Sequence, residues 1–355
     1  MTAYQAHRLF IIFSFIVCLT PLRLLAQSFV NTTDTSSHRL YDFTGSQYGL
    51  VLARLNNDPY PDMVTSGHYE DIITVQYNDG KGSFGNSTTF SVGIAPEAVV
   101  SADFNADGLT DLAVGCQGSF FIQGSIAILI NGGNGPMGVT TTYLDMPIRL
   151  HNLTVADFNN DGRPDIAVGG GYGKYQILTG RGDGTFIVGA ASVLNNDTGI
   201  RITAADFDRD GWVGLAFSSA SNVRILRNTG AGQFTQVFSW VPTSNGTIVG
   251  LDAGDANNDG WPDVALAVYT EENCVLLLTN SGSGQITNTP HVVGNAALAT
   301  FVRIADATGD GIADLLVGQL AKTSIQLWQG TSGGTLQPVA DYQTGGGWVN
   351  QHCRQ

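Results

Sequence analysis

Positive charge is scarce in this sequence. Lysine and arginine together number 16 against 30 aspartate and glutamate residues, which leaves a formal net charge of −14. A surface with that balance repels the phosphate backbone of nucleic acids and the head groups of anionic lipids, and it attracts cations. We therefore expect no nucleic-acid partner.

Cysteine is also rare, with four in the whole chain. Cys18 lies in an apolar N-terminal run, and the other three, Cys116, Cys274 and Cys353, are an odd number at wide spacing. Such a set is not the framework of a disulfide-stapled domain, although one pair could form. No Cys/His cluster has the spacing of zinc ligands.

Long apolar runs are missing beyond the first 26 residues. There, Arg8 precedes an apolar run over residues 9–19, and Leu24-Leu25-Ala26 resembles a cleavage site. This is the pattern of a secretory signal peptide, and the run is shorter than the ~20 residues that a membrane-spanning helix needs. We expect residues 1–26 to be removed and no membrane span to remain. The mature protein would be secreted, extracellular or on the cell surface, or periplasmic in a bacterium.

Sustained helical periodicity is absent as well, whereas glycine is abundant, with 45 residues. Charged residues make up only 13% of the chain. This composition is typical of short apolar strands joined by tight turns, and it argues against long charged helices and against disorder.

An acidic nine-residue segment recurs six times. Its clearest copy reads Asp-Phe-Asn-Asn-Asp-Gly-Arg-Pro-Asp from Asp157, and successive copies begin 49, 54, 49, 49 and 51 residues apart. The first copy has Arg54 at position 1 and Pro59 at position 6, and the fourth has Gly214 at position 9. The six copies span residues 54–62, 103–111, 157–165, 206–214, 255–263 and 306–314.

The sequence around each acidic loop repeats too. A short apolar run precedes each loop, a second follows it, and a third leads to a Gly/Asn turn and a fourth, polar run. Four short strands in each repeat of ~50 residues predict an all-β fold, a β-propeller of four-stranded blades over residues 28–350. A parallel β-helix is the alternative, but its repeats are usually much shorter.

The acidic loops have the ligand chemistry of a calcium site. Oxygen atoms at positions 1, 3, 5 and 9, with glycine at position 6, suit a hard cation such as Ca²⁺, and the carbonyl at position 7 would add a backbone ligand. The expected ligands are Asp103, Asn105, Asp107, Leu109 and Asp111; Asp157, Asn159, Asp161, Arg163 and Asp165; Asp206, Asp208 and Asp210; Asp255, Asn257, Asp259, Trp261 and Asp263; and Asp306, Thr308, Asp310, Ile312 and Asp314.

Turn formation alone does not explain these loops. Asp, Asn and Gly favour turns, but the six loops hold 17 of the 30 acids of the chain at fixed offsets, two in the first loop and three in each of the others. Clustered like charges cost several kcal/mol without a counter-ion. We expect calcium in the second, third, fifth and sixth loops, in a structural role. The fourth loop is a weaker candidate, and the first is expected to be empty.

The chain also resembles a known repeat family. Phe84-Gly85, then Gly93-Ile94-Ala95-Pro96, and then the 103–111 loop resemble an FG-GAP or VCBS-like repeat, the unit of the propeller in integrin alpha subunits and many bacterial secreted proteins. The resemblance covers roughly residues 28–345, with a specific calcium motif and with Phe-Gly and Gly-Ala-Pro elements that are clear in one repeat. It implies a calcium-braced propeller, typically of seven blades, used for adhesion or ligand binding.

The ends of the chain depart from that pattern. Residues 28–41 and 336–344 each read as a fourth strand, and Trp348-Val349 reads as the start of another blade. Either six blades are closed by one of these segments, or the sequence is a truncated seven-blade propeller, which the resumed pattern in the tail slightly favours.

The rim opposite the calcium loops is the expected ligand surface. It would carry aromatic and polar residues from the loops between the second and third strands and from the connections between blades: His68, Tyr69, Glu70, Phe120, Phe121, Arg149, His151, Tyr172, Lys174, Tyr175, Tyr269 and Glu271. Arg181-Gly182-Asp183 spells an adhesion tripeptide but lies in a predicted turn between strands.

These features predict a non-catalytic module that binds or adheres to an extracellular protein or carbohydrate. No Gly-x-Ser-x-Gly elbow or other recognisable nucleophile–base set occurs, so no enzyme activity is expected. The alternatives are a polysaccharide-active enzyme such as a lyase on a calcium-braced propeller, and a purely structural scaffold.

Overall fold

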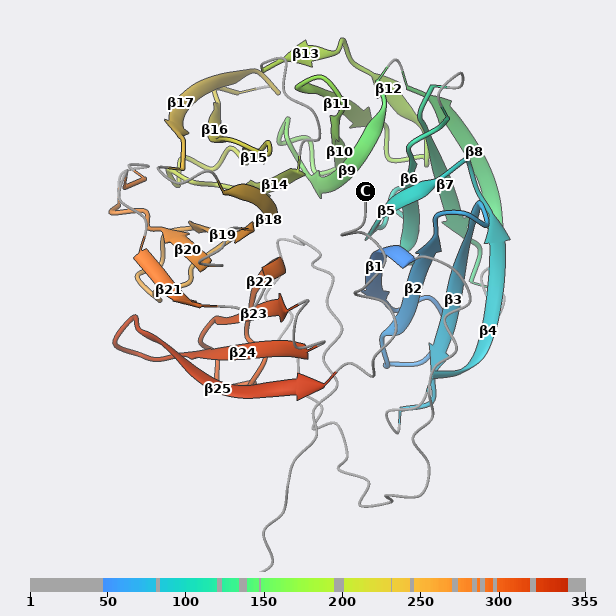
Figure 1. Cartoon of the computed structure of the whole chain (residues 1–355). Helices are drawn as coiled ribbons and strands as arrows, with labels where there is room; N and C mark the ends of the chain where they lie inside the picture. The colour runs from blue at the N-terminus through green and yellow to red at the C-terminus, as the bar shows by residue number, and fades with distance from the viewer. Residues whose placement is uncertain are drawn as a thin grey trace, which may run out of the picture.

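The described part of the chain consists of β-strands and the loops between them. The computed structural model describes residues 47–80, 84–119, 123–133, 139–146, 148–194, 201–230, 232–242, 246–269, 274–282, 286–287, 291–295, 299–319 and 324–343. Within these ranges no helix occurs, and so none that is long and apolar enough to cross a membrane. The strands form six antiparallel sheets around a common axis, which are the blades of a six-blade propeller (Figure 1).

Each blade takes its strands from one consecutive stretch of sequence. The first three blades are β1 (Gln47–Ala53), β2 (Asp62–Gly67), β3 (Ile72–Asn78) and β4 (Phe84–Ser91); β5 (Pro96–Ala102), β6 (Asp111–Cys116), β7 (Ser125–Asn131) and β8 (Val139–Asp145); and β9 (Leu150–Ala156), β10 (Asp165–Gly170), β11 (Lys174–Gly180), β12 (Phe186–Val188) and the short β13 (Ser192–Val193). The other three are β14 (Arg201–Ala205), β15 (Gly214–Ser218), β16 (Val223–Asn228) and β17 (Phe234–Trp240); β18 (Thr247–Gly254), β19 (Asp263–Tyr269), β20 (Cys274–Leu278) and β21 (His291–Asn295); and β22 (Ala299–Ala305), β23 (Asp314–Gln319), β24 (Ser324–Gly330) and β25 (Leu336–Gln343).

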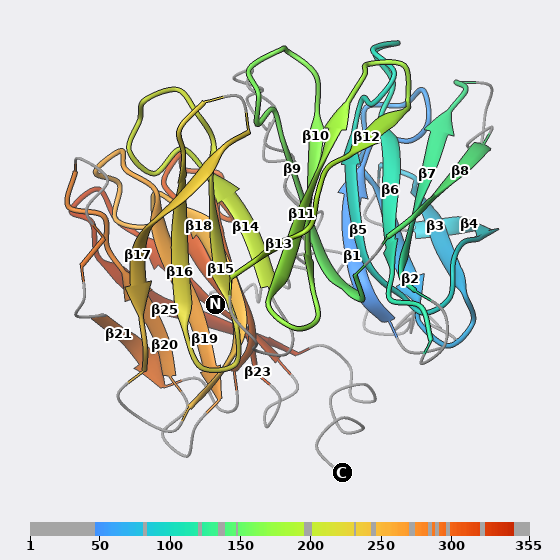
Figure 2. The same ribbon diagram turned by 90° about the horizontal axis from the view of Figure 1, so that it is seen from above.

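The first strand of every blade lies next to the axis and the fourth lies outside (Figure 1). Successive inner strands pack against one another from β1 through β5, β9, β14 and β18 to β22. Between β22 and β1 the described residues show no comparable contact. The blades stand side by side around the axis when the molecule is turned (Figure 2).

The second strand of each blade is the most deeply buried. All six residues of β2, β6, β10 and β23 are buried, whereas the outer strand β17 is largely exposed. A second strand has a sheet neighbour on both edges and an adjacent blade on both faces, so its side chains are apolar without alternation. This burial explains the continuous apolar runs that follow the acidic loops in the sequence.

The structure confirms the main architectural predictions. Each acidic loop joins the first strand of a blade to the second, and residues 336–343 form the fourth strand β25 of the last blade. The signal peptide, residues 28–41 and Trp348-Val349 lie outside the described residues. Cys116 is a buried free thiol, and burial raises the pKa of this thiol to about 12, so it is chemically quiet.

Buried asparagines link neighbouring blades. Asn228, at the end of β16, donates from Nδ2 to the carbonyl oxygen of Phe158 in the preceding blade at 2.7 Å and to that of Val213 at 3.1 Å. Its Oδ1 accepts the Gly230 N–H at 3.1 Å. Asn131 and Asn280 make the same pair of bonds, one to the acidic loop of the preceding blade and one to the loop of their own blade. These asparagines tie blade to blade at the loop end of the propeller.

We expect Asn228→Ala to lower the free energy of unfolding by about 2 kcal/mol, because the buried Val213 carbonyl group loses its donor, while that of Phe158 keeps only the Gly232 N–H at 3.1 Å. Chemical unfolding followed by tryptophan fluorescence would measure the change. The matched control is Asn57→Ala, which removes an exposed cross-blade bond of 3.4 Å to Gly133 and should cost about 0.5 kcal/mol or less. Equal costs for the two variants would contradict the role given to Asn228.

Candidate metal centres

The third acidic loop shows how the sequence folds around its carboxylates. The carboxylate of Asp157 accepts the backbone N–H groups of Asp161, at 3.1 Å, and Gly162, at 2.7 Å. Asn159 Oδ1 accepts the Asp161 N–H at 2.9 Å, and Asp161 Oδ1 accepts the Arg163 N–H at 2.9 Å. The side-chain oxygens at positions 1, 3 and 5 are thus held by the backbone that curls around them.

Two left-handed residues make that curl. Asn160 at position 4 has φ 54° and Gly162 at position 6 has φ 81°. Left-handed backbone favours glycine, which explains the glycine at position 6, and asparagine tolerates it better than most residues. Position 4 is left-handed in the second, fourth, fifth and sixth loops too. The loop conformation is therefore shared, although the residue at position 4 varies.

The second, fifth and sixth loops repeat this hydrogen-bond pattern. The position-1 carboxylates of Asp103, Asp255 and Asp306 each accept the N–H groups of positions 5 and 6 at 2.7–3.1 Å. In four loops the position-3 asparagine also donates from Nδ2 to the position-5 carboxylate, at 2.8 Å, 2.8 Å, 3.2 Å and 3.0 Å in the first, second, third and fifth loops. A cation in the loop would replace this amide contact.

The acid at position 9 occupies a different environment. Asp62, Asp111, Asp165, Asp263 and Asp314 are each the first residue of a second strand and are 0% exposed. In the third loop, Asp165 accepts the Phe158 N–H at 3.0 Å and the Gly180 N–H at 2.8 Å. The others accept the equivalent pair of N–H groups. This acid therefore joins its loop to the end of the third strand.

A small residue lies opposite each position-9 acid. The last residue of the first strand pairs with it across the ladder, and this partner is alanine in the first, second, third and sixth blades and Gly254 in the fifth. In the fifth blade a Cβ atom at Gly254 would lie 2.9 Å from Ile304 Cγ2 of the next blade, so the packing between blades restricts this position to a small residue.

Burial dominates the ionisation of these acids. Desolvation raises the pKa of Asp111 and of Asp165 to about 6 and that of Asp263 to about 7, while the backbone N–H groups lower it and the acids at positions 5 and 1 raise it again. The pKa values of Asp62 and Asp314 are raised by the same desolvation. A nearby cation would reverse the repulsion among the three acids of one loop.

We expect the metal-free protein to become more stable when the pH falls from 8 to 5. The folded acids have pKa values of about 6–7 against an ordinary value of 3.8, so the stability they contribute is fully present below pH 3.8 and is lost as the pH rises through 6–7. The melting temperature in EGTA should rise by at least about 3 °C over this range.

Calcium should flatten this pH dependence, because a cation favours the ionised acids. Groups whose pKa is lowered, such as Asp310, change their charge only below a pH of about 4, so they do not affect the stability between pH 5 and 8. A melting temperature in EGTA that rises with pH from 5 to 8 would contradict the assignment.

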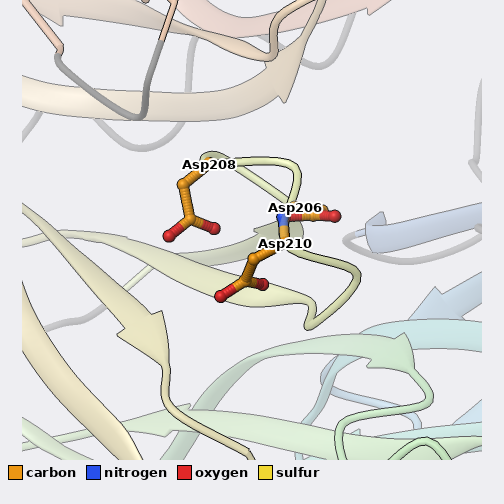
Figure 3. Close-up of side chains that lie close together, drawn as sticks. All are labelled: Asp206, Asp208 and Asp210. Atoms are coloured by element: carbon orange, nitrogen blue, oxygen red, sulfur yellow. The ribbon is translucent and has the colours of Figure 1, made fainter.

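The fourth loop brings three acids together. Asp206, Asp208 and Asp210 are the only group of three acidic, histidine or cysteine residues in the described ranges whose ligand atoms all lie within 4.8 Å of one another (Figure 3). The four stronger candidate loops carry Asn or Thr at position 3, and their third acid is the buried one at position 9. Gly214 takes position 9 here, and a Cβ atom at this glycine would lie 2.8 Å from the carbonyl oxygen of Leu226.

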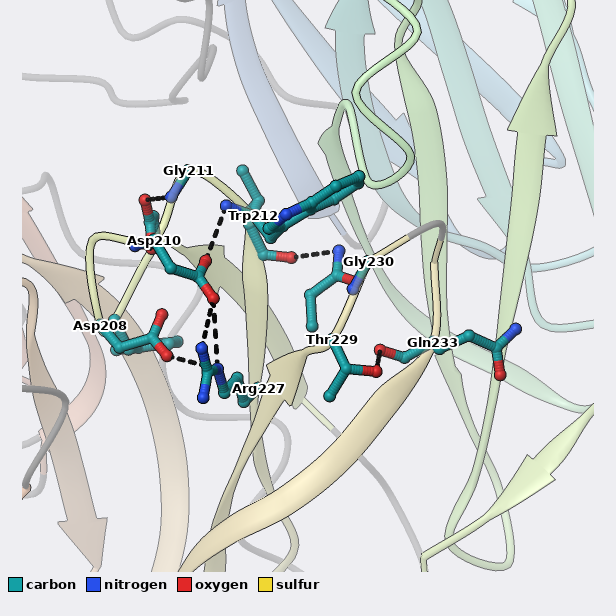
Figure 4. Close-up of polar contacts among 12 residues, drawn as sticks. Asp208, Asp210, Gly211, Trp212, Arg227, Thr229, Gly230 and Gln233 are labelled. Atoms are coloured by element: carbon teal, nitrogen blue, oxygen red, sulfur yellow. Dashed lines mark hydrogen bonds and ion pairs between the residues drawn. The ribbon is translucent and has the colours of Figure 1, made fainter.

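Arg227 from β16 forms ion pairs with two of the three acids of the fourth loop. Its Nε lies 2.6 Å from Asp208 Oδ2 and its terminal nitrogen lies 2.7 Å from Asp210 Oδ2 (Figure 4). The pKa of Asp210 is lowered overall: partial burial raises it, but the hydrogen bonds from Arg227 and Trp212 lower it more. The same bond to Asp210 raises the pKa of Arg227. Burial and the charge of Asp210 raise the pKa of Asp208 despite Arg227. The guanidinium thus occupies the place of a counter-ion.

The position-7 residues stack over turns on the loop face. Trp212 and Trp261 lie against Gly230 and Gly282 respectively, in the turn between the third and fourth strands of the same blade. The Arg209 guanidinium lies 4.7 Å from the Trp261 ring centroid and links the fourth and fifth loops.

The first loop keeps part of the pattern: Asn56 donates to the Asp58 carboxylate at 2.8 Å, and Arg54, at position 1, is exposed.

The far rim, opposite the acidic loops, carries several of the predicted ligand residues. Tyr69 and Tyr172 are 67% and 68% exposed, and Arg149 is exposed too. Tyr175 was expected on this rim, but it is buried against Phe217, because it lies inside β11 rather than in the turn before it. Phe120, Phe121 and Glu271 lie outside the described residues, as does the side chain of Tyr269.

Sequence reasoning missed Glu97 and Gln117 on the far rim and the blade-linking asparagines. Glu97, in β5, lies within 3.1 Å of His151 and accepts a bond of 2.7 Å from Gln117. No sequence pattern singles these two out. The blade-linking asparagines could have been found from the sequence, because an asparagine recurs at or just after the end of the third strand in three repeats, at Asn131, Asn228 and Asn280.

Known proteins resemble this chain in sequence repeat and in fold. The model of the FG-GAP-like repeat family matches residues 54–114, 116–168, 157–216, 213–266 and 257–317. No curated protein sequence matches the chain. An Agrocybe aegerita lectin that recognises non-reducing terminal N-acetylglucosamine is similar in structure, with 17% identity, a TM-score of 0.58, and coverage of 85% of this chain and 81% of the lectin.

Two other solved structures share the fold. A putative 6-phosphogluconolactonase from Bacteroides fragilis has 12% identity and a TM-score of 0.60, with 83% of this chain and 84% of that chain covered. BBS1N, solved in complex with ARL6DN, has 13% identity and a TM-score of 0.57, with 82% and 80% covered. At these identities the likeness concerns the propeller architecture, which serves unrelated functions.

Proposed function

This chain belongs to the FG-GAP-like repeat family, and from that premise we propose that it is a secreted, calcium-binding propeller that acts as a non-catalytic binding module for protein or carbohydrate. The observation that carries the proposal is that the two rims of the propeller carry different chemical groups. One rim holds loops of inward-turned carboxylates, and the other exposes Tyr69 and Tyr172 beside polar side chains.

The loop residues fit a calcium ion by their donor chemistry. All side-chain donors are oxygen atoms, and the position-9 acid is near enough to the acids at positions 1 and 5 for their charges to raise its pKa. Asp157, Asn159, Asp161 and Asp165, with the carbonyl of Arg163, would hold the ion in the third loop, and the equivalent residues would do so in the second, fifth and sixth. Calcium would supply the missing positive charge. We propose that the fourth loop needs no ion, because Arg227 supplies that charge.

A binding role is supported by the chemistry of the far rim and by the lectin among the structural neighbours. Exposed tyrosines with polar groups beside them suit sugars and protein surfaces. The test is a glycan array and a panel of matrix proteins probed with the mature chain, in calcium and in EGTA. Dose-dependent, saturable binding without turnover would support the proposal. Binding to no glycan and no matrix protein would favour a structural scaffold.

A polysaccharide-cleaving enzyme is the second candidate. The observation that favours it is the contact of 3.1 Å between His151 Nδ1 and Glu97 Oε2, because a carboxylate can orient an imidazole as a base. Incubation with acidic polysaccharides, followed by the ultraviolet absorbance of unsaturated product ends, would detect a lyase. Product formation that disappears in His151→Ala would replace the binding proposal.

A further inference from the structure

Five polar side chains from three blades form one cluster on the far rim. We call His68, Glu97, Gln117, Arg149 and His151 the rim cluster. Arg149 donates to Gln117 Oε1 at 2.8 Å, and Gln117 Nε2 donates to Glu97 Oε1 at 2.7 Å. His151 Nδ1 lies 3.1 Å from Glu97 Oε2, and His68 Nδ1 lies 3.9 Å from Glu97 Oε1. The cluster therefore bridges the first, second and third blades through one carboxylate.

The donors and acceptors in the cluster follow from Arg149, which can only donate, and Glu97, which as a carboxylate can only accept. Arg149 has only donors, so it fixes the Gln117 amide with its oxygen towards Arg149 and its NH₂ group towards Glu97. His151 Nδ1 lies 3.1 Å from Glu97 Oε2 and 3.2 Å from Gln117 Nε2. Glu97 as a carboxylate only accepts, and Gln117 Nε2 already donates to Glu97 Oε1, so the neutral His151 ring that bonds to Glu97 carries its proton on Nδ1. His151 Nε2 is then an acceptor, and it lies 3.8 Å from where a Cβ of Gly171 would be. Arg149 makes one of its five N–H donors available to Gln117 and remains exposed.

Two exposed tyrosines flank the rim cluster. Tyr69 packs edge-on against His68 with ring centroids 4.9 Å apart, yet it remains 67% exposed. Tyr172 follows Gly171, whose N–H donates to the Arg149 carbonyl oxygen at 2.7 Å, so it lies next to the other end of the cluster. The two tyrosines thus adjoin the cluster in the first and third blades.

Tyr172 is held in an unfavourable backbone conformation. Its φ is 59°, in the left-handed region, and it is the only aromatic residue with positive φ in the described ranges. A bulky side chain is rarely found there, and Asn or Gly would be favoured. Burial does not compensate, because the side chain is 68% exposed. An exposed side chain on a strained backbone marks this position as a candidate for a binding role.

We propose that this surface of the first three blades binds a neutral saccharide, with Tyr69 and Tyr172 packing against the apolar faces of sugar rings and Arg149 and His151 Nε2 bonding to neighbouring hydroxyl groups. This inference rests on the proposed function and names its ligand class. A hydroxyl group both donates and accepts, so a pair of them matches a guanidinium and an imidazole acceptor. The negative charge of Glu97 lies among the positive charges of Arg149 and Arg201 and is offset by them, so the cluster offers no unpaired acid to repel a sugar.

Titration calorimetry of the full mature chain tests the site. The probes are N-acetylglucosamine, galactose, mannose and, as an acidic arm, glucuronic acid. The variants are Tyr172→Asn, Tyr69→Asn and Arg149→Gln, and the matched control is Val237→Asn, an exposed apolar side chain of β17 in the fourth blade. We expect a neutral sugar to bind the wild type and the control equally, and each of the three variants at least about tenfold more weakly.

Stability separates a lost contact from a damaged fold. Asparagine tolerates the left-handed region, so Tyr172→Asn should melt no lower than the wild type while it loses affinity. Unchanged sugar affinity in all three variants would overturn the site and leave the proposed binding function standing. Preference for glucuronic acid would overturn the neutral class. Absence of binding to any probe would overturn the inference, and the glycan array and matrix panel would then decide separately whether the binding function fails with it.

Discussion

Calcium at 5 mM should raise the melting temperature of the mature chain by roughly 10 °C above its value in EGTA. Extracellular calcium modules bind with Kd values of about 10⁻⁴–10⁻³ M, so each occupied loop would add on the order of 1 kcal/mol. Four loops would add about 4–5 kcal/mol, and a domain of this size gains roughly 2–3 °C per kcal/mol. Differential scanning calorimetry over a calcium titration, with magnesium as the comparison ion, would measure the shift.

The variants that test this shift act at position 1. Asp157→Ala in the third loop should remove about a quarter of the calcium-induced rise, since the four proposed sites contribute independently. The matched control is Asp206→Ala in the fourth loop, where Arg227 already lies against the other two acids. That variant should keep the full rise. An equal loss in both variants, or an equal effect of magnesium, would refute the proposed set of sites.

The repeat made much of the fold predictable. Six acidic loops at near-constant spacing predict six repeats of a four-stranded blade, while the ends of the chain left six and seven blades open. The structure shows six blades, with each loop between the first and second strands. The apolar runs after the loops predict buried second strands, because a strand covered on both faces needs no polar side. Local patterns of this kind are visible in sequence because each blade is built from consecutive residues.

The parts that could not be predicted depend on contacts between distant residues. Arg227 lies 17 positions after Asp210, and nothing in the nine-residue loop indicates that a strand residue will occupy the cation's place. Glu97 and His151 are 54 positions apart and meet only because the second and third blades pack side by side. Tyr175 was placed in a turn because turn boundaries are uncertain by a residue or two, and that error exchanged an exposed ring for a buried one.

Within each loop, too, the local pattern was predictable and the contacts with distant residues were not. The sequence predicts that position 9 carries a ligand, because its carboxylate recurs at a fixed offset. It does not reveal that this carboxylate is buried and bonded to the end of the third strand, since Gly180 and Gly330 leave no side-chain pattern there. Position 9 therefore has a structural role that is independent of the metal.

Replacing Asp165 with alanine should lower the free energy of unfolding by about 3–5 kcal/mol, in EGTA as well as in calcium. The change leaves the N–H groups of Phe158 and Gly180 without their acceptor in a site that is 0% exposed. Unpaired buried donors carry their full desolvation cost, whichever ion is present. Asp157→Ala is the comparison within the same loop, and in EGTA it should cost about 1 kcal/mol, because the donors it releases are exposed to water.

Asparagine at position 165 separates the charge of the acid from its hydrogen bonds. Asp165→Asn keeps one acceptor oxygen, so in EGTA it should be less damaging than alanine, and at neutral pH it also avoids the burial of a charge. In calcium it should lose the contribution of the third loop to the melting temperature, because a neutral amide is a weaker ligand than a carboxylate. Urea unfolding of wild type, Asp165→Ala and Asp165→Asn in both media would measure these differences. If alanine at position 165 were costly only in calcium, the carboxylate would act as a metal ligand alone, and the link between loop and third strand would contribute nothing.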